Sequence, residues 1–167
     1  MASALFPKAD HDHANCTKTL IEFAEHYCST EGLRFTRLRR DVLSEVAASH
    51  KAIGAYQILN NFAAQGRKLS PISVYRSLDF LQEAGLIHRL DSTNSYFACQ
   101  RPLEADQACC TNHPLVFLVC DDCGTIGEVD GAPLAPLIER FAAHGDFDSS
   151  HGQLEIKGLC RFCQQAD

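Results

Sequence analysis

Four stretches in the first half of the chain carry apolar residues three and four positions apart. This spacing places the apolar side chains on one face of a helix, so each stretch predicts a helix with one buried side. The four ranges are 17–31, 36–48, 55–65 and 70–84. The residues predicted to face the core are Leu20, Phe23, Ala24, Tyr27, Cys28, Leu38, Val42, Leu43, Val46, Ile58, Leu59, Phe62, Val74, Leu78 and Leu81.

Polar and special-conformation residues separate these predicted helices. Thr36 and Ser70 are typical N-caps, because a hydroxyl accepts a hydrogen bond from a free N–H group of the first turn. Pro71 follows Ser70 at the first helical position, where its fixed φ suits helix entry. Gly66 and Gly85 are typical helix stops. The predicted helices therefore begin and end at residues with a physical reason to be there.

The pattern changes after residue 85. Residues 86–90 and 95–98 predict two strands, and the polar residues 91–94 between them predict a turn. Helices followed by a β-hairpin are typical of a winged helix-turn-helix domain, in which the fourth helix would enter the DNA major groove. Enzymes and protein-binding modules also use this scaffold, so the fold alone does not establish DNA binding.

The second half of the chain predicts a small α/β unit. After a polar connector at 100–112, the pattern predicts strands at 115–119 and 125–129, a helix at 132–143 and a strand at 153–159. A unit of this size buries little core, and such domains are commonly reinforced by a metal ion or by dimerisation.

Charge is divided unevenly between the two halves. The net charge is −6, but residues 1–90 carry eleven Lys/Arg against nine Asp/Glu, whereas residues 91–167 carry four against twelve. This asymmetry suggests two domains with different partners. Contact with DNA would have to rest on a local cluster such as Arg34, Arg37, Arg39 and Arg40. A run of this kind also occurs on ordinary solvated helix faces.

Hydropathy and cysteine usage indicate a cytoplasmic protein. The longest apolar run, 114–120, is too short to span a bilayer, and residues 1–13 lack the features of a secretory signal. In a reducing compartment the nine cysteines are not expected to form disulfides, so metal ligation becomes their leading use. Cys16 and Cys28 are expected to pack on helix faces.

Two Cys-x-x-Cys motifs carry the strongest chemical signal. They are Cys120 with Cys123 and Cys160 with Cys163, separated by 36 residues. Each follows a predicted strand, and a two-residue spacer lets both thiolates reach one ion. Four thiolates suit tetrahedral zinc in a closed, structural site. A redox-active motif of the thioredoxin type is the main alternative, but Gly124 favours a metal knuckle.

A second group of candidate ligands lies near the predicted domain junction. It consists of His88 on the first hairpin strand, Cys99 after the second, His113 beside the connector and Glu128 beyond the first knuckle. Taken singly, each has an ordinary alternative, because such histidines are often packed or solvated and Cys99 could be a buried thiol.

Three segments together resemble the ferric-uptake-regulator family of metal-dependent repressors. They are Pro71 to Leu81, containing Val74-Tyr75-Arg76, then Gly85-Leu86-Ile87-His88, then Cys120-Asp121-Asp122-Cys123-Gly124. The likeness runs from about residue 17 to 163. The wing segment 91–96 and the cysteine at position 99 are similar to the zinc-responsive branch of the family.

The resemblance implies a fold, a ligand set and a function. The fold is α+β: a flexible tail at 1–15, a winged-helix DNA-binding domain at 16–99, a connector at 100–112 and a zinc-braced dimerisation domain at 113–167. His88, Cys99, His113 and Glu128 match the regulatory zinc ligands, which makes two zinc ions per monomer with the structural site. A thiolate in this set favours zinc over Fe(II) or Mn(II).

The implied partners are DNA and a second copy of the chain. The resemblance predicts a cytoplasmic homodimer that represses zinc-uptake genes from a pseudo-palindromic operator when zinc is plentiful. Tyr75 and Arg76 are expected to contact bases, and Tyr56 and Arg37 the backbone. Neither a membrane nor an organic small-molecule substrate is expected.

Three other classes of protein remain as alternatives. One is an iron, manganese, nickel or peroxide sensor of the same family, although Leu115, Val116 and Phe117 stand where those sensors carry a His/Asp-rich segment. Another is a zinc hydrolase or thiol oxidoreductase, but neither predicted site offers an open position with a neighbouring base. The third is a zinc-ribbon module that binds protein. An enzyme is therefore not expected.

Overall fold

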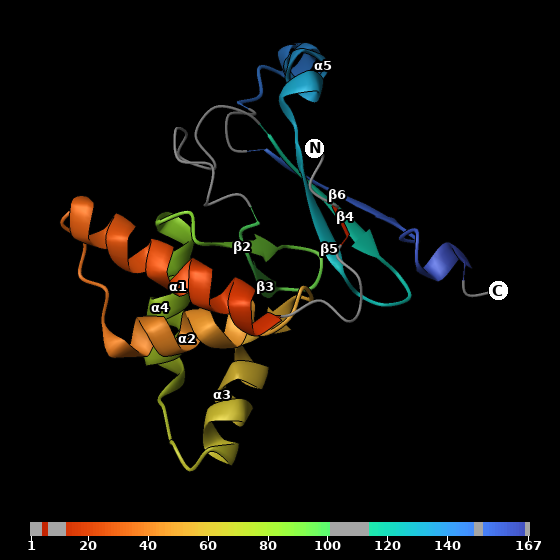
Figure 1. Ribbon diagram of the computed structural model, residues 1–167. Coiled ribbons are helices and arrows are strands. Elements are labelled where there is room, and N and C mark those ends of the chain that lie inside the picture. Colours follow the sequence, from red (N-terminus) through yellow and green to blue (C-terminus); the bar gives the residue numbers. More distant parts are fainter. Residues whose placement is uncertain (1–4, 7–12, 101–113, 149–151, 166–167) are drawn as a thin grey trace. The chain divides into compact units, whose positions relative to one another are not determined.

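The computed structural model describes residues 5–6, 13–100, 114–148 and 152–165 (Figure 1). The chain divides into two compact units. The N-terminal unit comprises residues 10–107, and the C-terminal unit comprises residues 108–167 together with 1–9. Most of the predicted connector at 100–112 lies outside the described residues, as does His113. No helix in the described part of the chain combines the length and apolarity that a bilayer crossing needs.

The N-terminal unit contains four helices and a small sheet. The helices are α1 (His13–Thr30), α2 (Arg37–Ala47), α3 (Ala55–Ala64) and α4 (Pro71–Glu83). The strands β1 (Ile53–Gly54), β2 (Ile87–Leu90) and β3 (Ser95–Ala98) form an antiparallel sheet in the order β1-β3-β2. The expected winged-helix order of helices and hairpin is confirmed.

Two features of this unit were not predicted. Strand β1 pairs Ile53 with Tyr96, and two residues are too few to show an alternating pattern. Helix α1 begins at His13 rather than residue 17, so residues 13–15 of the predicted tail are helical. The added turn is polar: Thr19 donates its hydroxyl to the Asn15 carbonyl, and no apolar repeat marks it in the sequence.

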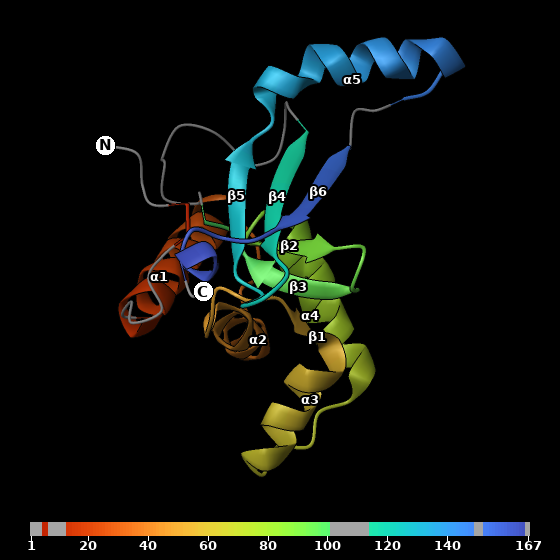
Figure 2. The ribbon, with the colours of Figure 1, turned by 90° about the vertical axis from the view of Figure 1, so that its right-hand side faces the viewer.

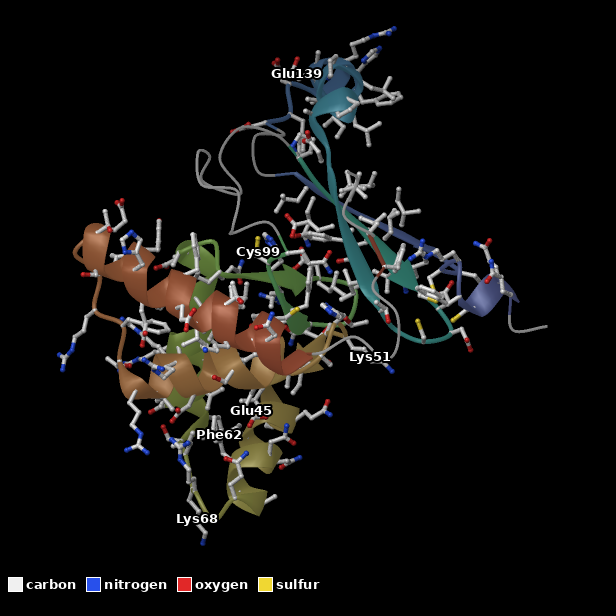
Figure 3. All side chains as sticks on the ribbon, viewed as in Figure 1. Glu45, Lys51, Phe62, Lys68, Cys99 and Glu139 are labelled. Atoms are coloured by element: carbon white, nitrogen blue, oxygen red, sulfur yellow. The ribbon has the colours of Figure 1, made fainter. Side chains whose placement is uncertain are left out.

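The four helices and the hairpin bury one core. The predicted inward positions near the middle of each helix are fully enclosed, including Ala24, Val42, Ile58 and Leu78. Phe23, Leu38 and Leu59 lie partly buried at the rim. Helices α2 and α3 also contact each other through Glu45, which accepts hydrogen bonds from the Asn61 and Gln65 side chains at 2.8 and 3.0 Å. Figure 3 labels Glu45 on α2 and Phe62 on α3.

The predicted helix signals act as expected around α4. The Ser70 hydroxyl accepts a hydrogen bond from the Ser73 N–H, and Pro71 occupies the first turn. Thr36 caps α2 in the same way through the Arg39 N–H. At the other end Gly85 has a φ of +68°, which few other residues adopt easily. Gly85 therefore turns the chain directly from α4 into the hairpin.

The C-terminal unit is a three-stranded mixed sheet with one helix (Figure 2). Strands β4 (Leu115–Cys120) and β5 (Ile126–Asp130) are antiparallel, and β6 (Gln153–Gly158) pairs with the other edge of β4 in parallel. Parallel neighbours need a crossover connection, and it contains α5 (Ala135–Ala142) between two short 3₁₀ segments, Ala132–Leu134 and Ala143–Gly145. A further 3₁₀ turn spans Cys163–Gln165.

The predicted helix at 132–143 is therefore broken at its start. Proline has no N–H, so Pro136 cannot donate the hydrogen bond that would continue an α-helix from residue 132. The chain forms a 3₁₀ turn first, with the Leu134 N–H donating to the Gly131 carbonyl at 2.8 Å, and the α-helix begins at Ala135.

Two residues from the beginning of the chain lie on the C-terminal unit. A Cβ atom at Gly127 of β5 would come within 2.8 Å of the Leu5 Cγ atom, and Arg161 donates to the Phe6 carbonyl at 3.5 Å. At this point the predicted tail is packed against the sheet, because the absent side chain of Gly127 leaves room for Leu5.

The close approach of Gly131 to the start of β4 can be tested by substitution. A Cβ atom at Gly131 would stand 1.9 Å from the Pro114 carbonyl oxygen, so Gly131→Ala must displace backbone at the start of β4. We expect a loss of about 2 kcal/mol or more in the free energy of unfolding, measured by urea denaturation. Gly145→Ala is the matched control, since nothing lies within 4 Å of its Cβ position. Equal stability of the two variants would contradict the predicted clash.

Candidate functional site

The two Cys-x-x-Cys motifs meet at one end of the C-terminal sheet. Cys120 ends β4, and Cys160 follows β6 by two residues. Because β4 and β6 run in parallel with Cys120 opposite Gly158, both strands end at the same end of the sheet. Gly124 has a φ of +72° and donates its N–H to the Cys120 carbonyl at 2.9 Å, which closes the first knuckle as a tight turn.

The four thiols form one cluster. The sulfur atoms of Cys120, Cys123, Cys160 and Cys163 all lie within 4.8 Å of one another, and those of Cys123 and Cys160 are 3.8 Å apart. Four sulfurs around a tetrahedral zinc at about 2.3 Å are about 3.8 Å from each other. The cluster therefore fits a zinc ion, and it supplies all four ligands without an open position.

Hydrogen bonds shift the pKa values of two thiols of this cluster in opposite directions. The Cys160 N–H donates to the Cys120 sulfur at 3.3 Å, and this contact is the largest of several hydrogen bonds that together lower the pKa of the Cys120 thiol to about 6. A hydrogen bond with Asp122, together with burial, raises the pKa of Cys163. The lowered pKa of Cys120 favours the thiolate, which is the form that binds a metal ion. Metal ligation must displace the proton that the raised pKa favours on Cys163, which makes metal affinity pH-dependent.

Two further candidate metal ligands lie on the hairpin of the N-terminal unit. His88 on β2 is opposite Phe97 on β3, and the Cys99 N–H donates to the Leu86 carbonyl at 3.1 Å. This register puts His88 and Cys99 on the same face. Both are buried, and a ring nitrogen of His88 lies within 4.8 Å of the Cys99 sulfur. Figure 3 labels Cys99 just beyond β3.

The other two candidates for this set belong to the C-terminal unit or its approach. Glu128 is on β5 opposite Phe117 of β4, and its side chain is buried. His113 lies outside the described residues. The hairpin therefore supplies an imidazole and a thiol as neighbours, and the C-terminal sheet supplies a buried carboxylate.

The residues predicted to contact DNA lie on three helices of the N-terminal unit. Arg76 is exposed on α4, and Tyr75 beside it is partly buried. Tyr56, on the first turn of α3, is 71% exposed, and Arg37 is exposed at the first position of α2. These four side chains remain candidates for a DNA interface.

Two arginines of the cluster contact other helices of the N-terminal unit. Arg40 forms an ion pair with Glu25 of α1, and the Arg39 guanidinium lies 3.4 Å from the centre of the Phe80 ring. Arg39 also donates to the Arg34 carbonyl. Arg39 and Arg40 therefore join helices of this unit. No local sequence signal reveals this, because Phe80 is distant in the chain.

Comparison with known proteins agrees with this combination of fold and sites. A winged-helix unit followed by a small mixed sheet with a four-cysteine cluster is consistent with a metal-responsive transcriptional regulator as a class of protein. A sequence profile of the Ferric uptake regulator family matches residues 30–157. The chain belongs to the ferric uptake regulator family.

Within this family the chain is similar to zinc uptake regulators. It is 32% identical to the zinc uptake regulation protein of Escherichia coli K12 over 151 residues, 90% of this chain and 85% of that protein. A zinc uptake regulator complexed with zinc and DNA superposes with a TM-score of 0.78 at 33% identity, covering 89% of this chain and 95% of that one. The peroxide-responsive repressor PerR of Staphylococcus aureus Mu50 is 27% identical over 80% of this chain and 84% of its own length.

The four-cysteine cluster can be tested by removing one ligand. Cys120→Ser is expected to lower the zinc content by one ion per monomer and to leave the C-terminal unit unfolded or the protein monomeric. Zinc binding at structural sites of this kind is worth on the order of 10–16 kcal/mol, comparable with the whole stability of a small domain. Zinc analysis, circular dichroism and analytical ultracentrifugation would measure these effects. Cys16→Ser, outside the cluster, is the control. A stable, folded dimer of Cys120→Ser would contradict the assignment.

Proposed function

We propose that this protein is a zinc-responsive transcriptional repressor that binds a pseudo-palindromic operator as a homodimer when its regulatory site holds zinc. The observation that carries the proposal is the neighbouring His88 and Cys99 on the hairpin of a winged-helix unit. The similarity to a zinc uptake regulator complexed with zinc and DNA supports both the metal and the partner. By the same likeness, the genes under its control are those of zinc uptake.

The regulatory site consists of His88, Cys99, His113 and Glu128. Thiolate, imidazole and carboxylate donors together favour zinc over the harder divalent ions. His88, Cys99 and Glu128 are all buried, which suits the ligands of an enclosed metal site. With the four-cysteine cluster, this makes two zinc ions per monomer, one structural and one regulatory.

The site acts by drawing ligands from both units. His88 and Cys99 belong to the DNA-binding unit, and Glu128 belongs to the C-terminal unit. Coordination by all these side chains favours one relative orientation of the units, so zinc shifts the population toward the form that binds DNA. DNA must in return tighten zinc binding, and a coupling of roughly 1–3 kcal/mol corresponds to about 5- to 150-fold in affinity.

Helix α4 is the recognition helix of this proposal. Arg76 suits a bidentate contact with guanine, and Tyr75 suits a thymine or a phosphate. Tyr56 and Arg37 contact the DNA backbone, which positions the helix without reading sequence. The exposure of Tyr56 and Arg76 leaves both side chains available for such contacts.

The C-terminal unit provides the dimer contact. It exposes a group of large apolar side chains on α5, on β6 and in the segments that flank them: Leu137, Phe141, Phe147, Leu154, Ile156 and Leu159. Large apolar side chains that are exposed in this number are typical of interaction surfaces. A two-fold dimer presents two α4 helices to two half-sites of an operator, which explains why a palindrome is expected.

A sensor of peroxide, iron, manganese or nickel within the same family is the second candidate. The identity with PerR keeps this class in view. The thiol beside His88 favours zinc instead. Metal analysis of protein purified without added metal, combined with thiol counts after peroxide treatment, separates the two candidates.

Cys99 tests the zinc response. Cys99→Ser is expected to leave a folded dimer whose operator affinity no longer rises with zinc, because the softest ligand of the regulatory set is lost. Electrophoretic mobility shifts at buffered free zinc would measure this, with Cys16→Ser as the control. An unchanged zinc dependence would remove Cys99 from the regulatory site.

Arg76 tests the base contact. Arg76→Ala is expected to weaken binding to the specific duplex by about 1–3 kcal/mol and to affect random duplex less, since a base contact is made only on the right sequence. Fluorescence anisotropy with both duplexes would show the difference. Lys18→Ala, an exposed charge removed from α1, controls for net charge. Equal losses on both duplexes would make Arg76 a phosphate contact.

A further inference from the structure

Ile72 is an apolar side chain exposed without a role in the fold. In the described part of the N-terminal unit, the exposed large hydrophobic residues are Leu33, Tyr56 and Ile72, at 39%, 71% and 65%. Tyrosine has a hydroxyl that water satisfies, and Leu33 is close to half-buried. Ile72 is the hydrocarbon side chain of this group that water surrounds most.

Local helix stability does not explain an isoleucine at this position. Helix α4 starts through the Ser70 cap and Pro71, both of which precede Ile72. A β-branched side chain is slightly less favourable in a helix than alanine. Isoleucine at position 72 therefore adds nothing to the start of α4 that a smaller residue would lack.

Ile72 lies on the helix face opposite the core. The buried residues of α4 are Val74, Ser77, Leu78 and Leu81. At 3.6 residues per turn, Ile72 and Arg76 are about 40° apart on the other side of the helix. Asp79 and Glu83 follow on that same side, and both are exposed. The outward face thus has an apolar and basic first half and an acidic second half.

This division limits where DNA can approach. Phosphates repel the carboxylates of Asp79 and Glu83, about 10 Å and more beyond Ile72 along the helix at 1.5 Å per residue. The first two turns carry no acidic residue. Recognition helices of this architecture place their N-terminal residues against base edges, so Ile72 and Arg76 would enter the major groove together.

The apolar group that the major groove presents is the 5-methyl of thymine. We propose that Ile72 is a specificity-determining residue whose side chain contacts a thymine methyl group in each operator half-site, next to the base contacted by Arg76. This inference rests on the proposed function and adds to it a base preference that Arg76 cannot supply, because a guanidinium reads hydrogen-bond acceptors and not methyl groups.

The test removes one methyl group from DNA and one side chain from the protein. Wild-type protein with zinc first selects duplexes from a random library, and each thymine of the selected duplex is then replaced singly by deoxyuridine. At one position of a half-site, this replacement is expected to weaken wild-type binding about fourfold, the value of one buried methylene-sized group. Ile72→Ala should lose at least about fourfold on the thymine duplex and no further affinity on the deoxyuridine duplex.

Two controls separate this contact from other effects. Leu33→Ala removes another exposed apolar side chain. Its affinity for DNA should change little, and by the same factor on the thymine and the deoxyuridine duplex. The thermal midpoint of Ile72→Ala should be no lower than that of the wild-type protein, because the side chain is exposed and alanine is the better helix former.

The outcomes distinguish this inference from the proposed function. If Ile72→Ala loses affinity equally on thymine and deoxyuridine duplexes, or loses none, the methyl contact is refuted and the repressor proposal stands. If the wild-type protein with zinc enriches no duplex, DNA binding itself fails. If Ile72→Ala then also abolishes capture of a protein partner, the exposed face belongs to a protein contact instead.

Discussion

The parallel pairing of β4 with β6 is the contact on which the C-terminal unit depends. It brings the ends of two strands, which are distant in sequence, to the same end of the sheet. The four thiols lie there within 4.8 Å of one another. The sheet has only three strands, and much of the apolar surface of α5 and β6 remains exposed. In a unit with so small a core, a zinc ion held by the four thiolates would add on the order of 10 kcal/mol of stability.

The N-terminal unit is stabilised differently, and this difference frees its outer face for recognition. Its core is continuous across four helices and the hairpin, so it requires no metal to close. Helix α4 gives one face to that core and keeps the other in solvent. The cation–π contact of Arg39 with Phe80 and the ion pair of Arg40 with Glu25 fix the helices against each other. Exposed arginines such as Arg37 and Arg76 carry positive charge on the face that we propose contacts DNA.

The hairpin connects recognition with metal chemistry. It follows α4 directly through Gly85, and its register places His88 and Cys99 on one face. A metal bound to these side chains would therefore be held by the hairpin that directly follows, in the chain, the helix that we propose reads DNA. The physical requirement for a response to zinc is that further ligands come from the other unit, since ligands on the hairpin alone would leave the relative orientation unrestrained.

The sequence alone determined most of the local structure and the identity of the four-cysteine cluster. Helical spacing predicted all four N-terminal helices, and caps such as Ser70 and Thr36 act through neighbouring residues, so their signals are local. The Cys-x-x-Cys spacing is local too. Tertiary structure decided what depends on distant partners: the strand β1, the contacts of Arg39 and Arg40 with other helices, and the packing of Leu5 on Gly127. The outward position of Ile72 belongs with the local features, because the helical spacing that turns Val74, Leu78 and Leu81 toward the core places Ile72 on the opposite face of α4. The features that only the tertiary structure decided each depend on a partner far away in the chain, and no local pattern specifies such a partner.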